Sequence, residues 1–168
     1  MKEMDKVLVN KEKVIYEGKP KYDAYLAHMI IGSLIGGIII GLFAGLFLKE
    51  TVYGIFSGII IFVIAMIMGH LYYSRLYYAI TDKRIVIQSG IIGRDFKSID
   101  YDQIQNVSVD VGIIGSIMKV GTIKIFTGEM ESAGKNGMQS KYDRIDYIET
   151  PYQILKKLQT EISKRKGR

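Results

Sequence analysis

Residues 24–48 read AYLAHMIIGSLIGGIIIGLFAGLFL and residues 51–74 read TVYGIFSGIIIFVIAMIMGHLYYS, with only Lys49 and Glu50 between them. Neither stretch contains Asp, Glu, Lys or Arg. Each exceeds the ~20 apolar residues that a helix needs to cross a bilayer core, and each is longer than the apolar region of a signal peptide. The sequence therefore predicts a transmembrane helical hairpin over residues 24–75, between an N-terminal segment, 1–23, and a C-terminal domain, 76–168.

Basic residues are distributed unevenly about this hairpin. Only Lys49 of the 23 Lys and Arg residues lies in the connection between the two stretches. By the positive-inside rule we expect both termini in the cytoplasm and the connection outside, as in a multi-pass protein of the cell membrane. Tyrosines favour the headgroup region, and they cluster at the expected cytoplasmic ends, with Tyr53 at the opposite end. The cluster comprises Tyr22, Tyr25, Tyr72, Tyr73, Tyr77 and Tyr78.

Small residues recur along both stretches at spacings that let helix backbones pack closely in lipid. The helix-packing candidates are Gly32, Gly36, Gly37, Gly41, Gly45, Gly54 and Gly58. Two interpretations stay open: the glycines pack the two helices of one hairpin, or a second glycine face joins copies into a homo-oligomer or binds another membrane protein. His28 and His70 are expected at nearly equal depth, where they either lie apart at the interface or face each other.

From residue 77 onward the hydrophobic pattern changes from helical to alternating. This alternation predicts short strands over 77–80, 84–88, 94–99, 106–110, 121–126 and 142–148, with Ile123 and Ile125 inward and Lys124 outward. We expect one helical turn or a wide loop over 112–119, and a long exposed loop over the Gly- and Ser-rich residues 128–137. Thr150 and Pro151 then begin a helix, whose apolar stripe comprises Ile154, Leu155, Leu158 and Ile162.

Several elements of the chain resemble the bacterial PH-like, membrane-flanked domain family (bacterial PH domain type 2). They are YAITDKRIVIQSGII at 78–92, IQNV at 104–107, GTI at 121–123 and YEGKP at 16–20. The resemblance implies an α+β membrane protein, in which a two-helix transmembrane hairpin is followed by a PH-like antiparallel β-barrel or sandwich with a C-terminal amphipathic helix as its cap. A fold of this kind hosts unrelated roles, so it does not specify a function.

The charges and residue types disfavour several function classes. The net charge is +6, but residues 76–162 contain 11 basic and 11 acidic residues, so we expect no nucleic-acid partner. With no cysteine and two histidines, no metal site or cofactor is expected. There is no Gly-x-Ser-x-Gly motif and no phosphate-binding glycine loop, and Asp100, Asp102 and Asp110 are typical turn residues. We therefore expect no catalytic residues and no enzyme.

Two groups of basic residues are candidates for contact with anionic lipid headgroups. The first matches positions that eukaryotic PH domains use for phosphoinositides: Lys83, Arg84, Arg94 and Lys97. The second is the C-terminal tail, which holds the excess positive charge: Lys164, Arg165, Lys166 and Arg168. The tail is the stronger candidate, because each basic residue near an anionic leaflet adds attraction, whereas Asp82 and Asp95 dilute the first group. The alternatives are an ordinary solvated surface and a solubilising terminus.

The function that these observations favour is a non-enzymatic, membrane-anchored PH-like interaction module at the cytoplasmic face. Its expected partners are the lipid bilayer, protein partners that include a second copy or another membrane protein, and anionic lipid headgroups. The alternative is a subunit of a small oligomeric channel or transporter. That alternative is disfavoured because such proteins need ionisable or hydrated groups inside the membrane, and the two stretches are glycine and aliphatic over most of their length.

Overall fold

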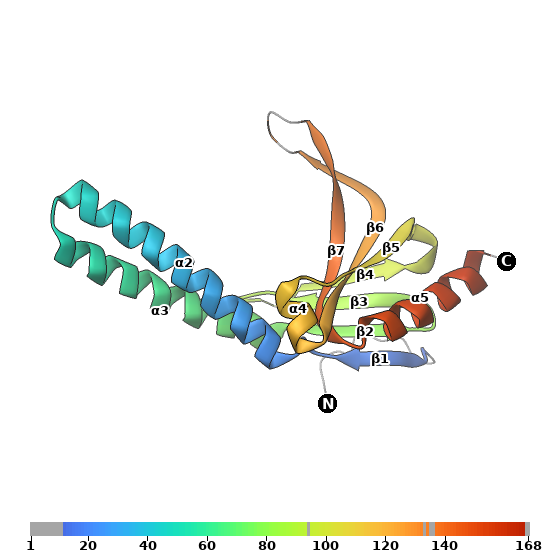
Figure 1. The fold of residues 1–168 in the computed structure, drawn as a ribbon. Helices are drawn as coiled ribbons and strands as arrows, with labels where there is room; N and C mark the ends of the chain where they lie inside the picture. Colours follow the sequence, from blue (N-terminus) through green and yellow to red (C-terminus); the bar gives the residue numbers. More distant parts are fainter. Residues whose placement is uncertain (1–11, 94, 133, 135–136, 167–168) are drawn as a thin grey trace.

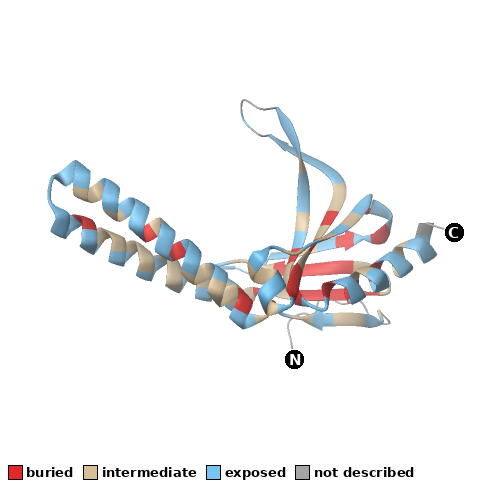
Figure 2. Cartoon of the chain, viewed as in Figure 1, coloured by how far each residue is buried: buried red, intermediate tan, exposed pale blue. Residues whose placement is uncertain are grey.

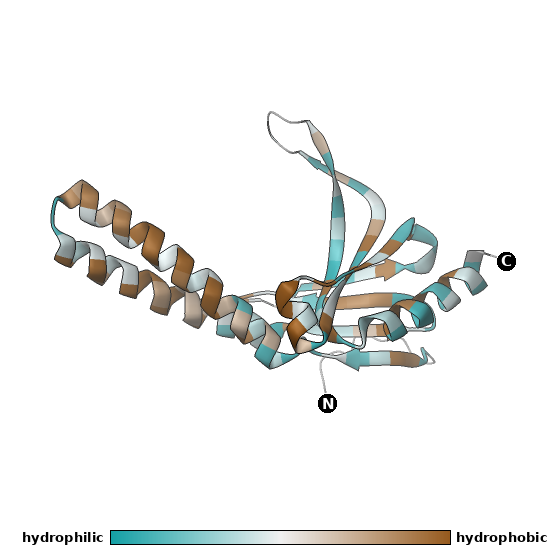
Figure 3. Cartoon of the chain, in the orientation of Figure 1, coloured by the Kyte–Doolittle hydropathy of each residue, from teal (hydrophilic) through white to brown (hydrophobic). Residues whose placement is uncertain are grey.

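The computed structural model describes residues 12–93, 95–132, 134 and 137–166. Two antiparallel helices, α2 (Tyr22–Leu48) and α3 (Thr51–Arg75), form a hairpin that projects from a domain of two β-sheets (Figure 1). Both helices are long and apolar enough to cross a membrane. Most of their residues are exposed, and the exposed surface is apolar over most of the hairpin (Figures 2 and 3).

The turn between the two helices lies where the sequence placed it. Lys49 adopts a left-handed conformation (φ 54°), and its N–H donates to the carbonyl of Gly45. This cap satisfies a carbonyl that the end of α2 would otherwise leave unpaired. Thr51 then begins α3 immediately after Glu50.

The first sheet contains four antiparallel strands in the order β1-β2-β3-β4. Their bounds are β1 (Val14–Gly18), β2 (Tyr77–Thr81), β3 (Arg84–Ser89) and β4 (Asp95–Asp100). β1 pairs with β2, with Glu17 opposite Ala79, so the hairpin is inserted between two neighbouring strands. We expected an N-terminal segment over residues 1–23, and within it residues 14–18 form β1 of the first sheet. Val14, Ile15 and Tyr16 are good strand formers, and they pair the backbone of what would otherwise be an exposed sheet edge.

The second sheet has the order β5-β6-β7. It is built from β5 (Asn106–Asp110), β6 (Val120–Ser132) and β7 (Met138–Glu149), with the 3-10 turn η1 (Tyr101–Gln103) before β5 and the short helix α4 (Ile113–Met118) between β5 and β6. The long exposed loop that we expected over 128–137 is wrong for residues 128–132, because β6 continues to Ser132, whereas β7 begins only at Met138. This extension is exposed to solvent on both faces and therefore lacks the alternation that reveals a strand.

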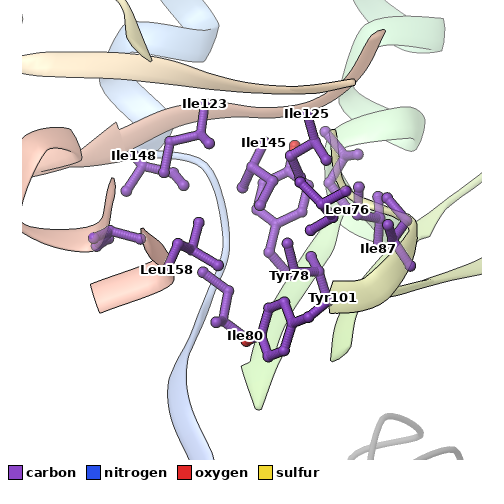
Figure 4. Packing of buried hydrophobic residues seen from close by; sticks show 14 residues of the cluster. Leu76, Tyr78, Ile80, Ile87, Tyr101, Ile123, Ile125, Ile145, Ile148 and Leu158 are labelled. Atoms are coloured by element: carbon purple, nitrogen blue, oxygen red, sulfur yellow. The ribbon is translucent and has the colours of Figure 1, made fainter. Parts of the chain in front are cut away.

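The core lies between the two sheets and the C-terminal helix α5 (Pro151–Lys166). Ile123, Ile125 and Ile145 come from the second sheet and pack with Tyr78 and Ile80 of the first (Figure 4). Ile154 and Leu158 of the expected apolar stripe on α5 are also buried there. The structure thus contains an α+β domain of antiparallel sheets with a helix over one side, as the sequence indicated.

Candidate membrane interface

One end of the domain is fixed directly to the hairpin. Three residues connect the end of β1 at Gly18 to α2, and one residue connects α3 to the start of β2 at Tyr77. We call this side the hairpin end of the domain, and the side with the 82–83 turn the far end. Because both connections are so short, they hold the sheet in one place at the helix ends rather than on a flexible tether.

Hydrogen bonds and one ion pair strengthen this junction. The N–H of Lys21 donates to the carbonyl of Tyr147 (2.9 Å), and its ammonium lies 3.1 Å from the carboxylate of Glu149. The hydroxyl of Tyr73 donates to the carbonyl of Pro20 (3.1 Å). These contacts join both helices to the sheets, so the hairpin and the domain form one unit.

Aromatic rings fill the space between the helices and β7. Tyr25 packs against Tyr73 and Tyr147, with centroid distances of 5.0 and 6.0 Å. His28 lies 5.9 Å from the ring of Tyr147, while His70 is exposed. Tyr147 has a positive φ of 53°, an uncommon conformation for a bulky residue, and burial raises the pKa of its phenol. No sequence pattern indicated this role of Tyr147.

The predicted helix-packing glycines fall into two groups. A Cβ added at Gly37 or Gly41 would lie 2.8 Å from a carbonyl oxygen of Gly58 or Gly54, respectively, and Gly45 also lies against Gly54. At these five glycines the backbones of α2 and α3 lie against each other. Gly32 and Gly36 have nothing within 4 Å of an added Cβ, so the hairpin itself does not use them.

The first group of basic residues lies mostly away from the hairpin. Lys83 and Arg84 are at the far end, since β2 runs away from the hairpin and turns there into β3. Arg84 lies 3.1 Å from Glu12. Lys97 lies 2.8 Å from Asp143 and 3.5 Å from Glu129. Arg94 is outside the described residues. Acidic partners thus offset much of the positive charge at the described positions.

The C-terminal end of α5, which includes Lys164 and Arg165 of the basic tail, also lies away from the hairpin. α5 extends outward from the domain (Figure 1), over about 24 Å at 1.5 Å per residue. Lys164 lies 2.7 Å from Glu161, and Arg165 is exposed. The side chain of Lys166 and all of Arg168 lie outside the described part of the chain. Contact of the tail with anionic lipid stays a prediction. Because α5 ends away from the hairpin, the tail is no longer the stronger of the two candidates.

Three other basic residues lie at the hairpin end of the domain, namely Lys19, Lys21 and Arg75. The ammonium of Lys19 donates to the carbonyl of Ser74 (3.1 Å) and lies 5.7 Å from the ring centroid of Tyr73. Their place next to the two apolar stretches was a signal that sequence reasoning could have used, because basic residues beside a span favour the headgroup region.

The acidic residues considered for catalysis are exposed at strand ends and in a turn. Asp110 lies 2.6 Å from the ammonium of Lys124, which holds the pKa of its carboxyl below the usual range. Asp100 ends β4 and Asp102 lies in η1, both exposed. Within residues 12–93, 95–132, 134 and 137–166, no group of three or more His, Asp or Glu side chains is placed to hold a metal ion.

Comparison with known proteins identifies the family of the chain. The family model for the bacterial PH domain matches residues 27–165, which is most of the chain. The chain belongs to the bacterial PH domain family. A structural search finds a DUF1696 family protein with a pleckstrin-homology domain from Shewanella loihica PV-4. It has 17% sequence identity and a TM-score of 0.36, over 54% of this chain and 73% of that one. No curated protein matches this bacterial PH domain chain.

Proposed function

We propose that the protein is a non-enzymatic interaction module, anchored in the cell membrane by the α2–α3 hairpin, whose PH-like domain binds protein partners or lipid headgroups at the cytoplasmic face. One observation carries this proposal. β1 precedes the hairpin and β2 follows it, yet the two strands pair, with Glu17 opposite Ala79. In a membrane, both flanks of the hairpin must therefore lie on one side, and the domain must lie against that surface.

The distribution of charge supports the cytoplasmic side. Lys49 is the single basic residue of the turn between α2 and α3, and the other 22 Lys and Arg residues belong to the two flanks. Lys19, Lys21 and Arg75 lie where the helices leave the domain. Basic residues this close to the spans set the orientation of a membrane protein.

The apolar surface of the hairpin does not favour a channel or transporter. A groove of about 600 Å³ follows the glycine contact and is lined by aliphatic residues, Phe62 and the glycines, with Thr51 at its outer end. A path for ions or polar solutes needs polar or ionisable lining. The groove instead suits acyl chains or another apolar helix.

Site-specific photocrosslinking in native membranes tests the proposal. A photoreactive amino acid is placed at three exposed domain positions, Met138, Tyr142 and Tyr152, and at Phe47 on the lipid-exposed surface of α2. An interaction module predicts a defined adduct at one or two domain positions, identified by mass spectrometry. Silent domain positions together with a self-adduct at Phe47 would contradict the module and favour assembly through the hairpin.

A further inference from the structure

Two loops of the domain share the sequence Gly-Ile-Ile-Gly. One is residues 90–93, between β3 and β4, and the other is residues 112–115, in which Gly112 is followed by the first turn of α4. No charged residue occurs within 89–93 or 111–118. We call these two segments the isoleucine loops. Each of them contains apolar side chains that are exposed to solvent.

These side chains are the most exposed large apolar groups of the described domain. The exposed fractions are 92% for Ile92, 83% for Ile113 and 77% for Ile117, whereas the next value in the domain is 67%, for the amphipathic Tyr152. Such fractions equal those of hairpin residues such as Phe47, at 88%. Clustered exposed apolar side chains on a soluble surface mark an interaction site.

Both isoleucine loops lie at the hairpin end, and each is bonded to a different helix terminus. The guanidinium of Arg75, the last residue of α3, donates to the carbonyls of Ile92 (3.4 Å) and Gly93 (3.3 Å). The ammonium of Lys21, just before α2, donates to the carbonyl of Met118 at the end of α4 (3.4 Å). α4 also contacts α2 directly (Figure 1). The loops are therefore held at the level where the hairpin would enter a bilayer.

The charges around the isoleucine loops suit the headgroup region. Lys21 and Arg75 hold the loops, and exposed Lys119 follows α4. The acidic residues at this end are Glu149, which pairs with Lys21, and the exposed Asp23 and Asp95. Exposed isoleucines can enter the acyl-chain region of a leaflet while basic residues next to them reach the lipid phosphates.

We propose that Ile92, Ile113 and Ile117 insert into the same leaflet that the hairpin crosses, so that the domain rests on the bilayer at the hairpin and at both isoleucine loops. This inference depends on the proposed membrane anchoring. It assigns the lipid surface itself, rather than a headgroup pocket near Lys83 or the C-terminal tail, as the partner of this end of the domain. Insertion at three places would fix the tilt of the domain and leave the far end directed to the cytoplasm.

Single tryptophans test the inference, because the chain contains none. The full chain is reconstituted in vesicles of phosphatidylcholine and phosphatidylglycerol, with or without brominated acyl chains that quench tryptophan on contact. The variants are Ile92→Trp and Ile113→Trp. Ile35→Trp, exposed in the middle of α2, is the lipid control, and Ser163→Trp, exposed near the end of α5, is the water control.

Insertion predicts that Ile92→Trp and Ile113→Trp emit at shorter wavelength than Ser163→Trp and lose intensity in brominated vesicles, as Ile35→Trp does. If both behave like Ser163→Trp while Ile35→Trp is quenched, the inference is wrong and the anchoring stands. A blue shift without quenching would mean that protein covers the loops, which also overturns it. If Ile35→Trp is not quenched either, the anchoring fails and the inference fails with it.

Discussion

At the scale of residues, Lys124 and Ile125 are neighbours on β6 with opposite surroundings. Ile125 is fully buried, as is Ile123, whereas Lys124 is partly exposed and pairs with Asp110. The alternation expected from the sequence is confirmed. Ile125→Ala should lower the free energy of unfolding by about 2–5 kcal/mol, because it leaves a cavity in the core. Lys124→Ala should cost less than about 1 kcal/mol, as for most exposed ion pairs.

Thermal unfolding of the full chain in detergent micelles measures both changes. The full chain is needed because β1 lies before the hairpin, so a fragment from residue 76 would lack one strand of the first sheet. Similar small losses for the two variants would contradict the burial of Ile125.

Tyr101 should make stability depend on alkaline pH. Its hydroxyl donates to the carbonyl of Thr81, and burial raises the pKa of the phenol. Below about pH 10 the phenol is protonated in both states, so it adds no pH dependence. Above that pH the unfolded chain releases the proton and the folded chain holds it, so stability falls as pH rises.

Tyr101→Phe removes this titration. At pH 8 the variant should be less stable by about 1–3 kcal/mol, because the carbonyl of Thr81 loses its partner. Above pH 10 the difference from wild type should shrink by up to about 1.4 kcal/mol per pH unit. Melting temperatures of both proteins at pH 8 and pH 11 provide the comparison. If the difference between variant and wild type does not change with pH, the phenol ionises as readily in the folded protein as in the unfolded chain.

At the scale of elements, the glycine contact between α2 and α3 permits a matched comparison. Gly41→Ala would bring its Cβ to 2.8 Å from the carbonyl oxygen of Gly54, so the helices must separate. We expect a loss of about 1–3 kcal/mol, typical of overpacking. Gly36→Ala meets nothing within 4 Å and should be neutral or stabilise by up to about 1 kcal/mol through helix propensity. SDS titration followed by circular dichroism measures both, and equal effects would contradict the packing.

The expected homo-oligomer is a separate matter and stays a prediction. Nothing lies within 4 Å of a Cβ added at Gly32 or Gly36, so a second copy has room to pack there as well as in the groove along the other glycines. The glycines at the α2–α3 contact pack one hairpin, and assembly through a second glycine face stays a prediction.

The outer parts of β6 and β7 form a ribbon of two strands, because β5 pairs only as far as Phe126. Met130 and Ser132 pair with Ser140 and Met138 beyond that point. A two-stranded ribbon exposed on both faces is marginally stable. Hydrogen exchange should therefore be faster at Met130–Ser132 than at Ile123–Ile125 on the same strand. Equal protection along β6 would mean that another surface covers the ribbon.

Sequence reasoning succeeded for elements with a local pattern and failed for the others. The helices around Lys49 and the inward positions of Ile123 and Ile125 follow from hydropathy over a few residues. The ribbon beyond Phe126 has no buried face, so nothing in its sequence distinguishes it from a loop. β1 was missed because its partner lies beyond the hairpin, although Val14, Ile15 and Tyr16 have strand-forming side chains. The junction at Tyr147 depends on contacts that no local pattern encodes.

At the scale of the whole molecule, the insertion of the hairpin between β1 and β2 decides how the protein can sit in a membrane. A domain joined to one helix by one linker could turn freely. Here the two helices enter and leave the same sheet, and Lys21 and Arg75 bond the adjacent loops. In this arrangement the C-terminal end of α5 lies away from the hairpin (Figure 1). The far end, with Lys83 and the C-terminal end of α5, is thus the part of the described domain that points away from the hairpin.

Cysteine labelling in intact cells tests this arrangement, because the chain has no cysteine and each variant would carry a single thiol. Glu50→Cys, next to the turn of the hairpin, should react with a membrane-impermeant maleimide. Lys13→Cys, before β1, and Ser163→Cys, near the end of α5, should react only after the cells are permeabilised. The two must behave alike, because β1 pairs with β2 in the same folded domain whose core α5 covers. The opposite pattern would place the domain outside the cell, and labelling of all three positions in intact cells would show that the hairpin does not span the membrane.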